Sequence, residues 1–101
     1  MIMEPLAKVL SRVLRQSGLE ADVRGWRAVE EWPEAVGPRV ANHTRAVGFR
    51  DGTLRVEVEG SAWMHEMGFL KRDLIRNLNR RLGDELIRDV RFAIARGGIQ
   101  R

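Results

Sequence analysis

The stretch Leu54-Arg55-Val56-Glu57-Val58-Glu59-Gly60-Ser61-Ala62-Trp63 decides the fold, because the spacing of apolar residues changes within it. Up to Glu59, apolar and charged residues alternate, which is typical of a strand with one buried face. Beyond Ser61, apolar residues recur every three or four positions as far as Leu82, and Gly83 follows. This predicts a helix that begins with Ser61 as N-cap and ends with Gly83 at C′.

A hairpin is predicted directly before this helix. Asp51-Gly52 is a preferred two-residue type I′ turn, and apolar residues alternate on both sides of it. If Arg50 pairs with Thr53, one face of the hairpin is apolar and the other is polar or small. The predicted pairs are Phe49 with Leu54 and Val47 with Val56 on the apolar face, and Gly48 with Arg55 and Ala46 with Glu57 on the other.

Two helices are predicted before the hairpin. The first spans roughly 4–17 and ends at Gly18, with Leu19 placed to contact Leu14. Its apolar residues recur at helical spacing and are Leu6, Val9, Leu10, Val13 and Leu14.

The second helix is expected to start with Asp22 as N-cap and to stop at Gly37. Its core face is predicted to consist of Trp26, Val29, Trp32 and Val36. Pro33 removes an amide donor inside this pattern, so we expect a kink or a restart there. A short helical turn over residues 38–42 follows.

A third strand is expected over residues 87–95, with Val90, Phe92 and Ile94 facing inward. A right-handed crossover over the long helix would place it beside the first strand and antiparallel to it. The prediction is therefore an α+β fold, in the order α-α-β-β-α-β, with helices on one face of a three-stranded sheet. Residues after the third strand are expected to form a frayed tail.

The composition indicates one small globular domain. The chain has 101 residues, 44% of them hydrophobic and 32% charged, so we expect one compact core shared by every element. Cysteine is absent, which excludes disulfides and thiolate metal sites. Lys8, Arg12 and Arg15 interrupt the N-terminal apolar residues, so neither a signal peptide nor a membrane span is predicted. A cytoplasmic protein is expected.

The positive charge lies in the C-terminal part of the chain. Residues 1–60 carry nine Lys/Arg and nine Asp/Glu, whereas residues 61–101 carry nine Lys/Arg and five Asp/Glu. Sixteen of the eighteen basic residues are arginine, whose planar guanidinium suits phosphates and carboxylates. A GC-rich genome produces the same bias, so both explanations remain open.

The long helix has a predicted buried stripe and an unusual outer side. Helical geometry places Trp63, Met67, Leu70, Leu74 and Leu78 inward, with Met64, Ile75 and Leu82 toward one edge. Phe69 falls opposite this stripe. The outward residues, predicted to bind a partner or nucleic acid, are His65, Phe69, Arg72, Arg76 and Arg80. A charged outer side is also what an ordinary surface helix has, but an aromatic ring among like charges does not help a helix.

Nothing in the sequence predicts catalysis. His43 and His65 are separated by the hairpin, and metal-ligand spacings, P-loops and nucleophile motifs are all absent. The paired acids at positions 30–31 and 84–85 lie near helix ends or on polar faces, where solvation explains them. We expect a non-enzymatic protein without cofactor or metal.

Five motifs, taken in order, resemble the DciA family of bacterial proteins over about residues 6–95. They are Trp32-Pro33-Glu34-Ala35-Val36-Gly37, Val40-Ala41-Asn42-His43-Thr44, Asp51-Gly52-Thr53-Leu54-Arg55-Val56, Ser61-Ala62-Trp63 and Leu78-Asn79. The resemblance implies a KH-like domain over residues 1–96 and a disordered tail over residues 97–101. The residues that match the motifs and are expected to have structural roles are Trp32, Gly37, His43, Thr44 and Trp63.

The resemblance also implies a role in DNA replication. Family members act with the DnaB-type replicative helicase, help to load it on DNA, and bind DNA with the aid of a basic extension. Few residues follow the third predicted strand here, so we expect weak DNA binding, to the single-stranded form. The GxxG loop of nucleic-acid-binding KH domains is also missing between the helices.

Two other functions remain open at this stage. One is a general KH-like module that binds RNA or DNA without a helicase. The other is a small scaffold or homodimer that associates through the side of the sheet carrying Ala46, Gly48 and Ala93, where small residues allow close approach.

Overall fold

The structure is a computed structural model that describes residues 3–99, apart from the side chains at positions 3, 4, 14, 16 and 17. The elements follow the order α1 (Met3–Ser17), α2 (Leu19–Gly25), α3 (Arg27–Ala41), β1 (Thr44–Arg50), β2 (Thr53–Val58), α4 (Ser61–Leu82) and β3 (Asp89–Ile94). The predicted α+β class is confirmed, and the arrangement is consistent with a KH-like fold. The predicted contact of Leu19 with Leu14 and the last two residues of the predicted tail lie outside the described residues.

The hairpin forms at the predicted turn. Asp51 has φ 50° and Gly52 has φ 78°, as a type I′ turn requires, and Phe49 pairs with Leu54. The register shifts between Ala46 and Gly48, so Ala46 rather than Val47 pairs with Val56, and Arg45 rather than Ala46 pairs with Glu57. Val47 is thus the extra residue of a β-bulge, which alternation of residue types could not reveal. Ala46 packs against the core, so its predicted place on the small-residue side of the sheet with Gly48 and Ala93 is wrong.

The strand order differs from the prediction. β3 pairs with β2 in parallel, and the order is β1-β2-β3, so β3 does not lie beside β1. The hairpin leaves the second edge of β2 unpaired, and the crossover through α4 returns the chain along that edge in the same direction. Val90 is buried and Phe92 partly buried, but Ile94 at the end of β3 is 50% exposed, so the predicted inner face is incomplete.

Three helices stand where two were predicted before the hairpin. Gly18, with φ 81°, separates α1 from α2, and Asp22 lies inside α2 instead of capping it. The Asp22 carboxylate accepts a 3.0 Å hydrogen bond from the backbone N–H of Asp51, so it caps the hairpin turn. Helix α3 continues through Pro33 and breaks at Gly37, where φ is 83° and ψ is 165°. The helical turn predicted after Gly37 is present, whereas the kink or restart predicted at Pro33 is wrong.

Trp26 does not join the core as predicted. It lies at the junction of α2 and α3 and is 45% exposed, whereas Trp32 is buried. Gly25 occupies the position next to the sheet, where an added Cβ would come within 2.0–2.4 Å of the Phe49 ring. The chain fits against Phe49 only because Gly25 has no side chain, and Trp26 is turned toward the edge of the sheet.

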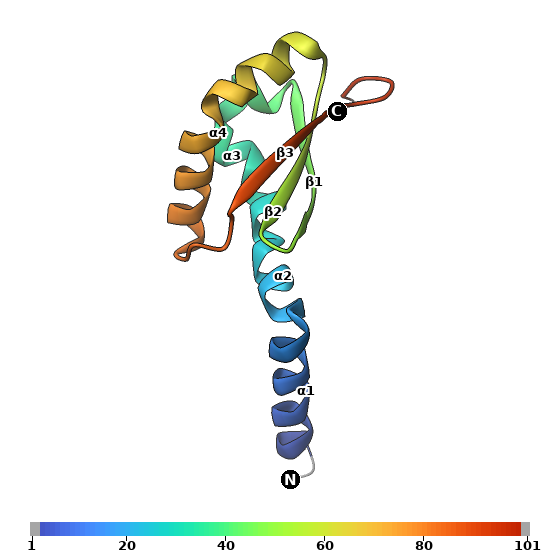
Figure 1. Cartoon of the computed structure of the whole chain (residues 1–101), viewed down its shortest axis with the longest axis vertical. Helices are drawn as coiled ribbons and strands as arrows, with labels where there is room; N and C mark the ends of the chain where they lie inside the picture. The colour runs from blue at the N-terminus through green and yellow to red at the C-terminus, as the bar shows by residue number, and fades with distance from the viewer. Residues whose placement is uncertain (1–2, 100–101) are drawn as a thin grey trace.

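The core lies between the sheet and the two helices α3 and α4, which Figure 1 shows on one side of the strands. Helix α1 takes little part in it, so the prediction of a core shared by every element is wrong. α1 packs mainly against α2 and projects from the body as a stem, which gives the molecule extents of 55 × 27 × 20 Å (Figure 1). Its apolar side is open to solvent, with exposed fractions of 50–59% at Leu6, Val9, Leu10 and Val13.

Between positions 3 and 99, none of the helices is long and apolar enough to cross a membrane.

Candidate functional site

Helix α4 is held by its buried face, as the sequence predicts. Met67, Leu74 and Leu78 are buried, and Trp63, Met64, Leu70, Ile75 and Leu82 pack partly buried against the same core. The helix ends in a Schellman motif, since the N–H groups of Gly83 and Asp84 donate to the carbonyls of Arg80 and Asn79. At its start Gly60 takes the N-cap position, and Ser61 makes no side-chain capping bond, so the predicted Ser61 cap is wrong. The orientation of α4 is therefore set by packing.

The outward side of α4 carries the residues predicted to bind a partner, which we call the α4 ridge: His65, Phe69, Arg72, Arg76 and Arg80. Phe69 is 77% exposed, although phenylalanine is usually buried. The His65 ring meets it edge-on, with ring centroids 4.9 Å apart and an angle of 89° between the planes. A large apolar ring is thus displayed at the surface with a histidine beside it.

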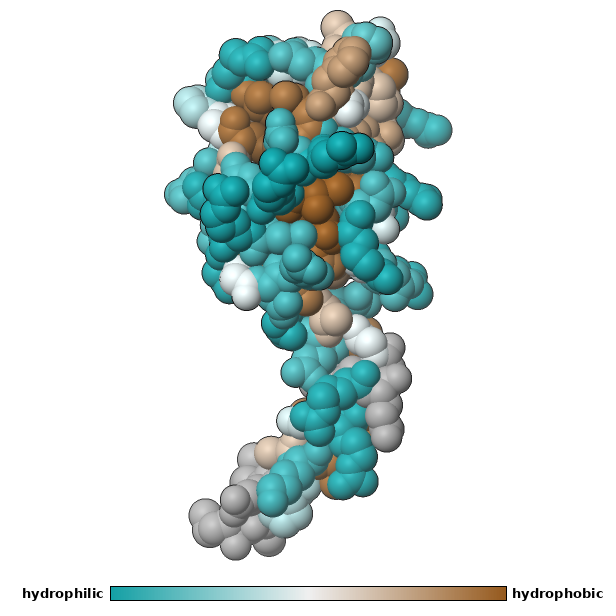
Figure 2. Space-filling model, turned by 60° about the vertical axis from the view of Figure 1, so that its left-hand side comes forward, coloured by the Kyte–Doolittle hydropathy of each residue, from teal (hydrophilic) through white to brown (hydrophobic). Residues whose placement is uncertain are grey.

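The arginines of the α4 ridge keep most of their positive charge available. Arg72 and Arg80 form no ion pair with any side chain that the structure describes. Arg76 lies 3.5 Å from Asp73, one turn away, but both side chains are largely exposed and such surface pairs are weak. The ridge is therefore not neutralised by its neighbours. Figure 2 turns the α4 side forward and shows a mostly hydrophilic surface with hydrophobic residues between.

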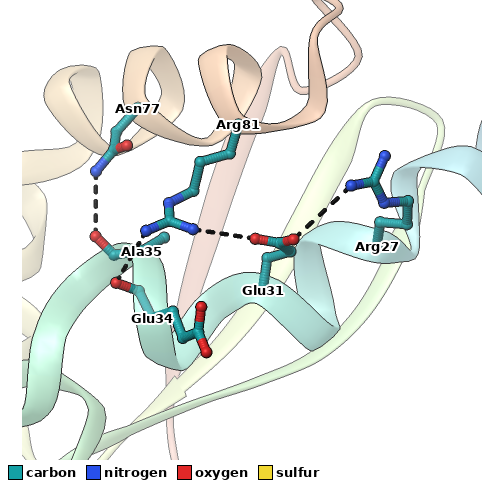
Figure 3. A network of polar contacts seen from close by, with 6 residues as sticks. All are labelled: Arg27, Glu31, Glu34, Ala35, Asn77 and Arg81. Atoms are coloured by element: carbon teal, nitrogen blue, oxygen red, sulfur yellow. Dashed lines mark hydrogen bonds and ion pairs between the residues drawn. The ribbon is translucent and has the colours of Figure 1, made fainter.

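Arg81 lies on the same helix but has a structural role. Its guanidinium lies 3.1 Å from the Glu31 carboxylate of α3 and 3.4 Å from the carbonyl oxygen of Glu34 (Figure 3). Arg27 approaches the same carboxylate at 3.7 Å, and the Asn77 amide donates to the carbonyl of Ala35 at 3.1 Å. These contacts join α4 to α3, which separates Arg81 from the free arginines of the ridge.

An open hollow of about 590 Å³ lies beside Phe69. Its lining includes Gly68, Lys71, Arg72, Arg88 and Asp89. Lys71 donates a 3.0 Å hydrogen bond to Asp89 at the start of β3, and this bond lowers the pKa of the Asp89 carboxyl below its ordinary value. Because Asp89 remains ionised, it offsets the charge of Lys71, while Arg72 stays available at the rim.

Trp32 and Thr44, two of the motif residues, join α3 to β1. The Trp32 indole N–H donates to the Thr44 hydroxyl at 2.9 Å, and that hydroxyl donates to the carbonyl of Val40 at 2.9 Å. Both side chains are buried. Gly37 supplies the break in α3 that brings Val40 and Thr44 to this point.

His43 and Trp63 join the start of β1 to α4. Their rings are stacked, with centroids 4.5 Å apart, and the guanidinium carbon of Arg39 lies 5.3 Å from the Trp63 ring centroid. His43 Nδ1 is also 3.0 Å from a carboxylate oxygen of Glu59. Trp63 is thus enclosed by side chains that pack on it, which favours the structural role expected for these motif residues.

Among the residues that the structure describes, His, Asp and Glu side chains do not gather in groups of three or more that could hold a metal ion.

Two features of the surface were not found by sequence reasoning. One is the exposed apolar side of α1. Its apolar residues recur at a spacing that is the same for a buried and for a solvent-exposed helix face. The other is a group of arginines on the outer side of the sheet, which becomes visible only when the strand order is known.

Comparison with known proteins shows to which family the chain belongs. The family model described as "Dna[CI] antecedent, DciA" matches residues 5–92. A UPF0232 protein of Corynebacterium glutamicum is 26% identical over 89 residues, which cover 88% of this chain and 50% of the relative. The UPF0232 proteins of Mycobacterium leprae and Mycobacterium tuberculosis are 26% and 24% identical over 89 residues, covering 47% and 48% of their lengths. The chain spans about half the length of these relatives. Because the family model covers most of its residues, the chain belongs to the DciA family.

Proposed function

We propose that this chain is a non-enzymatic DNA-replication factor that binds the DnaB-type replicative helicase and assists its loading on DNA. The observation that carries the proposal is the exposed Phe69 ring among arginines that keep their charge, on a helix otherwise fixed by its buried face. Membership of the DciA family supports the choice of partner. The proposed location is the cytoplasm, where that partner works.

The proposed mechanism uses binding energy alone. The α4 ridge contacts the helicase, with Phe69 as an aromatic anchor and Arg72, Arg76 and Arg80 as a charged rim. Binding stabilises the conformation of the helicase ring that admits single-stranded DNA, and no covalent step is needed. Weak binding of the chain to DNA keeps the helicase near its substrate.

A binding assay with purified replicative helicase tests the proposal. We expect Phe69→Ala to weaken the complex by more than any single change at Arg72, Arg76 or Arg80, because anchors dominate rims in protein interfaces. Arg81→Gln is the control variant. It removes the same charge from α4, but at a residue that pairs with Glu31 of α3 and does not belong to the α4 ridge. Helicase binding that is insensitive to Phe69 and to the three arginines would contradict the proposal.

The second candidate is a KH-like RNA- or DNA-binding module that acts without a helicase. The unpaired guanidiniums of Arg72 and Arg80 favour it, because they suit phosphates equally well. A pulldown from a bacterial lysate separates the two functions. Recovery of the replicative helicase supports the first, and recovery of RNA without the helicase supports the second.

A further inference from the structure

The outer face of the sheet lies away from the helices that form the core. Leu54, Val56 and Val58 of β2 face α3 and α4 and are buried, so the alternate residues of each strand point the other way. In Figure 1, α3 and α4 lie on one side of the sheet, and the other side has no helix of its own. The exposed residues on this outer side are Arg45, Arg50, Arg55, Arg91 and Ala93.

Two arginines stand next to each other on this face. Arg55 of β2 is paired in register with Arg91 of β3, and on its other side with Gly48 of β1. Neighbouring strands are about 4.8 Å apart, so the two positive side chains start from adjacent positions. Like charges directly opposite each other destabilise a sheet. The adjacent positions of Arg55 and Arg91 are therefore not explained by a contribution to the stability of the sheet.

The neighbouring carboxylates do not neutralise the pair. Arg55 has no ion-pair partner in the described part of the chain, and the same is true of Arg50. Arg91 is 78% exposed, and its closest carboxylate, Asp89, is 4.0 Å away and already hydrogen-bonded to Lys71. Glu57 is paired with Arg45. The guanidiniums of Arg50 and Arg55 are therefore available for an anion, and that of Arg91 is paired only at long range with Asp89.

An exposed aromatic ring lies at one end of the row. A Cβ added to Gly48 would lie 3.7 Å from the Arg55 guanidinium and 3.9 Å from the Trp26 ring, so the ring and the guanidinium converge over Gly48. Trp26 is 45% exposed. Beside it, Val23, Trp26, Glu30 and Phe49 line a hollow of about 410 Å³ together with Asp22.

We propose that the outer-sheet site, formed by Trp26, Gly48, Arg50, Arg55 and Arg91, binds single-stranded nucleic acid. The arginines would contact successive phosphates, and a base would stack on the Trp26 ring. Such stacking requires a base that is not paired in a duplex, which selects a single strand. Charge complementarity selects a polyanion, and the combination of ring and guanidiniums selects a nucleic acid strand. The inference deepens the weak DNA binding in the proposed function and locates it on a different face from the α4 ridge.

The first test compares two variants with the same net charge. Arg55→Gln/Arg91→Gln removes the adjacent pair, and Arg12→Gln/Arg27→Gln removes two exposed arginines from α1 and α3. Fluorescence anisotropy of a labelled oligothymidylate is measured against salt concentration. We expect the first variant to bind about tenfold more weakly, and its log-log salt slope to fall by about 1.4, since each phosphate contact on a single strand contributes about 0.7. An equal loss in both variants would overturn the site.

The second test concerns the ring. Trp26→Ala should weaken oligonucleotide binding roughly 5- to 100-fold, whereas Trp26→Phe should retain most of the affinity because it keeps a stacking surface. Circular dichroism checks that both variants are folded. Equal affinity of wild type and a folded Trp26→Ala variant, or tighter binding to a duplex of the same length than to the single strand, would overturn the inference.

Helicase binding by the same variants separates this inference from the proposed function. The Arg55→Gln/Arg91→Gln variant should bind the helicase as tightly as wild type does. A Phe69→Ala/Arg76→Gln variant should bind the oligonucleotide as tightly as wild type does. If the wild-type chain binds helicase but not the oligonucleotide, the outer-sheet site is wrong and the helicase contact stands. If it binds the oligonucleotide through Arg55 and Arg91 but does not bind the helicase, the proposed helicase contact is wrong and the outer-sheet site stands.

Discussion

The indole N–H of Trp32 donates a 2.9 Å hydrogen bond to the hydroxyl of Thr44, and both side chains are buried. The Thr44 hydroxyl uses its own proton for the carbonyl of Val40. A single hydroxyl therefore satisfies one donor and one acceptor where α3 passes into β1.

Replacing Thr44 with valine keeps the shape of the side chain but leaves both partners unsatisfied. We expect Thr44→Val to lower the free energy of unfolding by about 1–3 kcal/mol, measured by urea denaturation. Thr44→Ser keeps the hydroxyl and should lose less. A Thr44→Val protein as stable as wild type would show that the bond contributes nothing.

Gly37 and Gly68 should respond to alanine in opposite ways. Gly37 has φ 83° and ψ 165°, a conformation that only glycine adopts readily, so Gly37→Ala should cost about 1–3 kcal/mol of stability. Gly68 lies in the interior of α4 with no atoms in the way of a Cβ, so Gly68→Ala should stabilise the protein by about 0.5–1 kcal/mol. Thermal unfolding of the two variants measures both signs. Destabilisation of similar size in both would contradict the backbone argument.

Two aspartates should contribute to acid sensitivity. Hydrogen bonding by Arg24 lowers the pKa of Asp84, and hydrogen bonding by Lys71 lowers the pKa of Asp89. A folded-state pKa below the unfolded value gives stability that is present above about pH 3.9 and is lost as the pH falls through the folded-state pKa. Asp89→Asn should therefore lower stability at pH 7 by no more than about 1 kcal/mol, because the pair is partly exposed, and have less effect near pH 2. Urea titrations at several pH values between 2 and 7 check this, and a loss that grows toward low pH would contradict it.

Helix α1 should be dispensable for the stability of the rest of the chain. Its apolar residues at positions 6, 9, 10 and 13 are at least half exposed, so these four side chains bury little surface. Deleting residues 1–17 should change the free energy of unfolding by less than about 1 kcal/mol, because hydrophobic stabilisation scales with the apolar area buried. Leu78→Ala is the comparison, since Leu78 is fully buried in α4 and its truncation should cost about 2–5 kcal/mol. A deletion that destabilises as much as Leu78→Ala would place α1 in the core.

Local patterns in the sequence were sufficient for the hairpin turn and for α4. The Asp51-Gly52 turn needs only two residues with positive φ, and the buried face of α4 follows from helical spacing over 22 residues. For the same reason the exposure of Phe69 was predictable, because every other large apolar residue of the helix falls on or near the inner stripe.

Features that depend on distant residues were not predictable. The position of Trp26 depends on the Phe49 ring beside Gly25, and the bulge at Val47 shifts pairs that alternation alone would place one residue away. Placing β3 beside β1 hid the adjacency of Arg55 and Arg91, because only the observed order puts them in one row. The apolar residues of α1 recur at the same helical spacing as those of a buried helix face, so their exposure could not be predicted from the sequence.

The dissociation constant of the complex with purified DnaB-type helicase, measured by titration calorimetry for wild type and a folded Phe69→Ala/Arg76→Gln variant, tests the central claim most directly. The proposed role of the α4 ridge predicts that the double variant loses at least about 2 kcal/mol of binding free energy, roughly a thirtyfold rise in the dissociation constant. Equal dissociation constants for the two proteins would remove α4 from the partner surface.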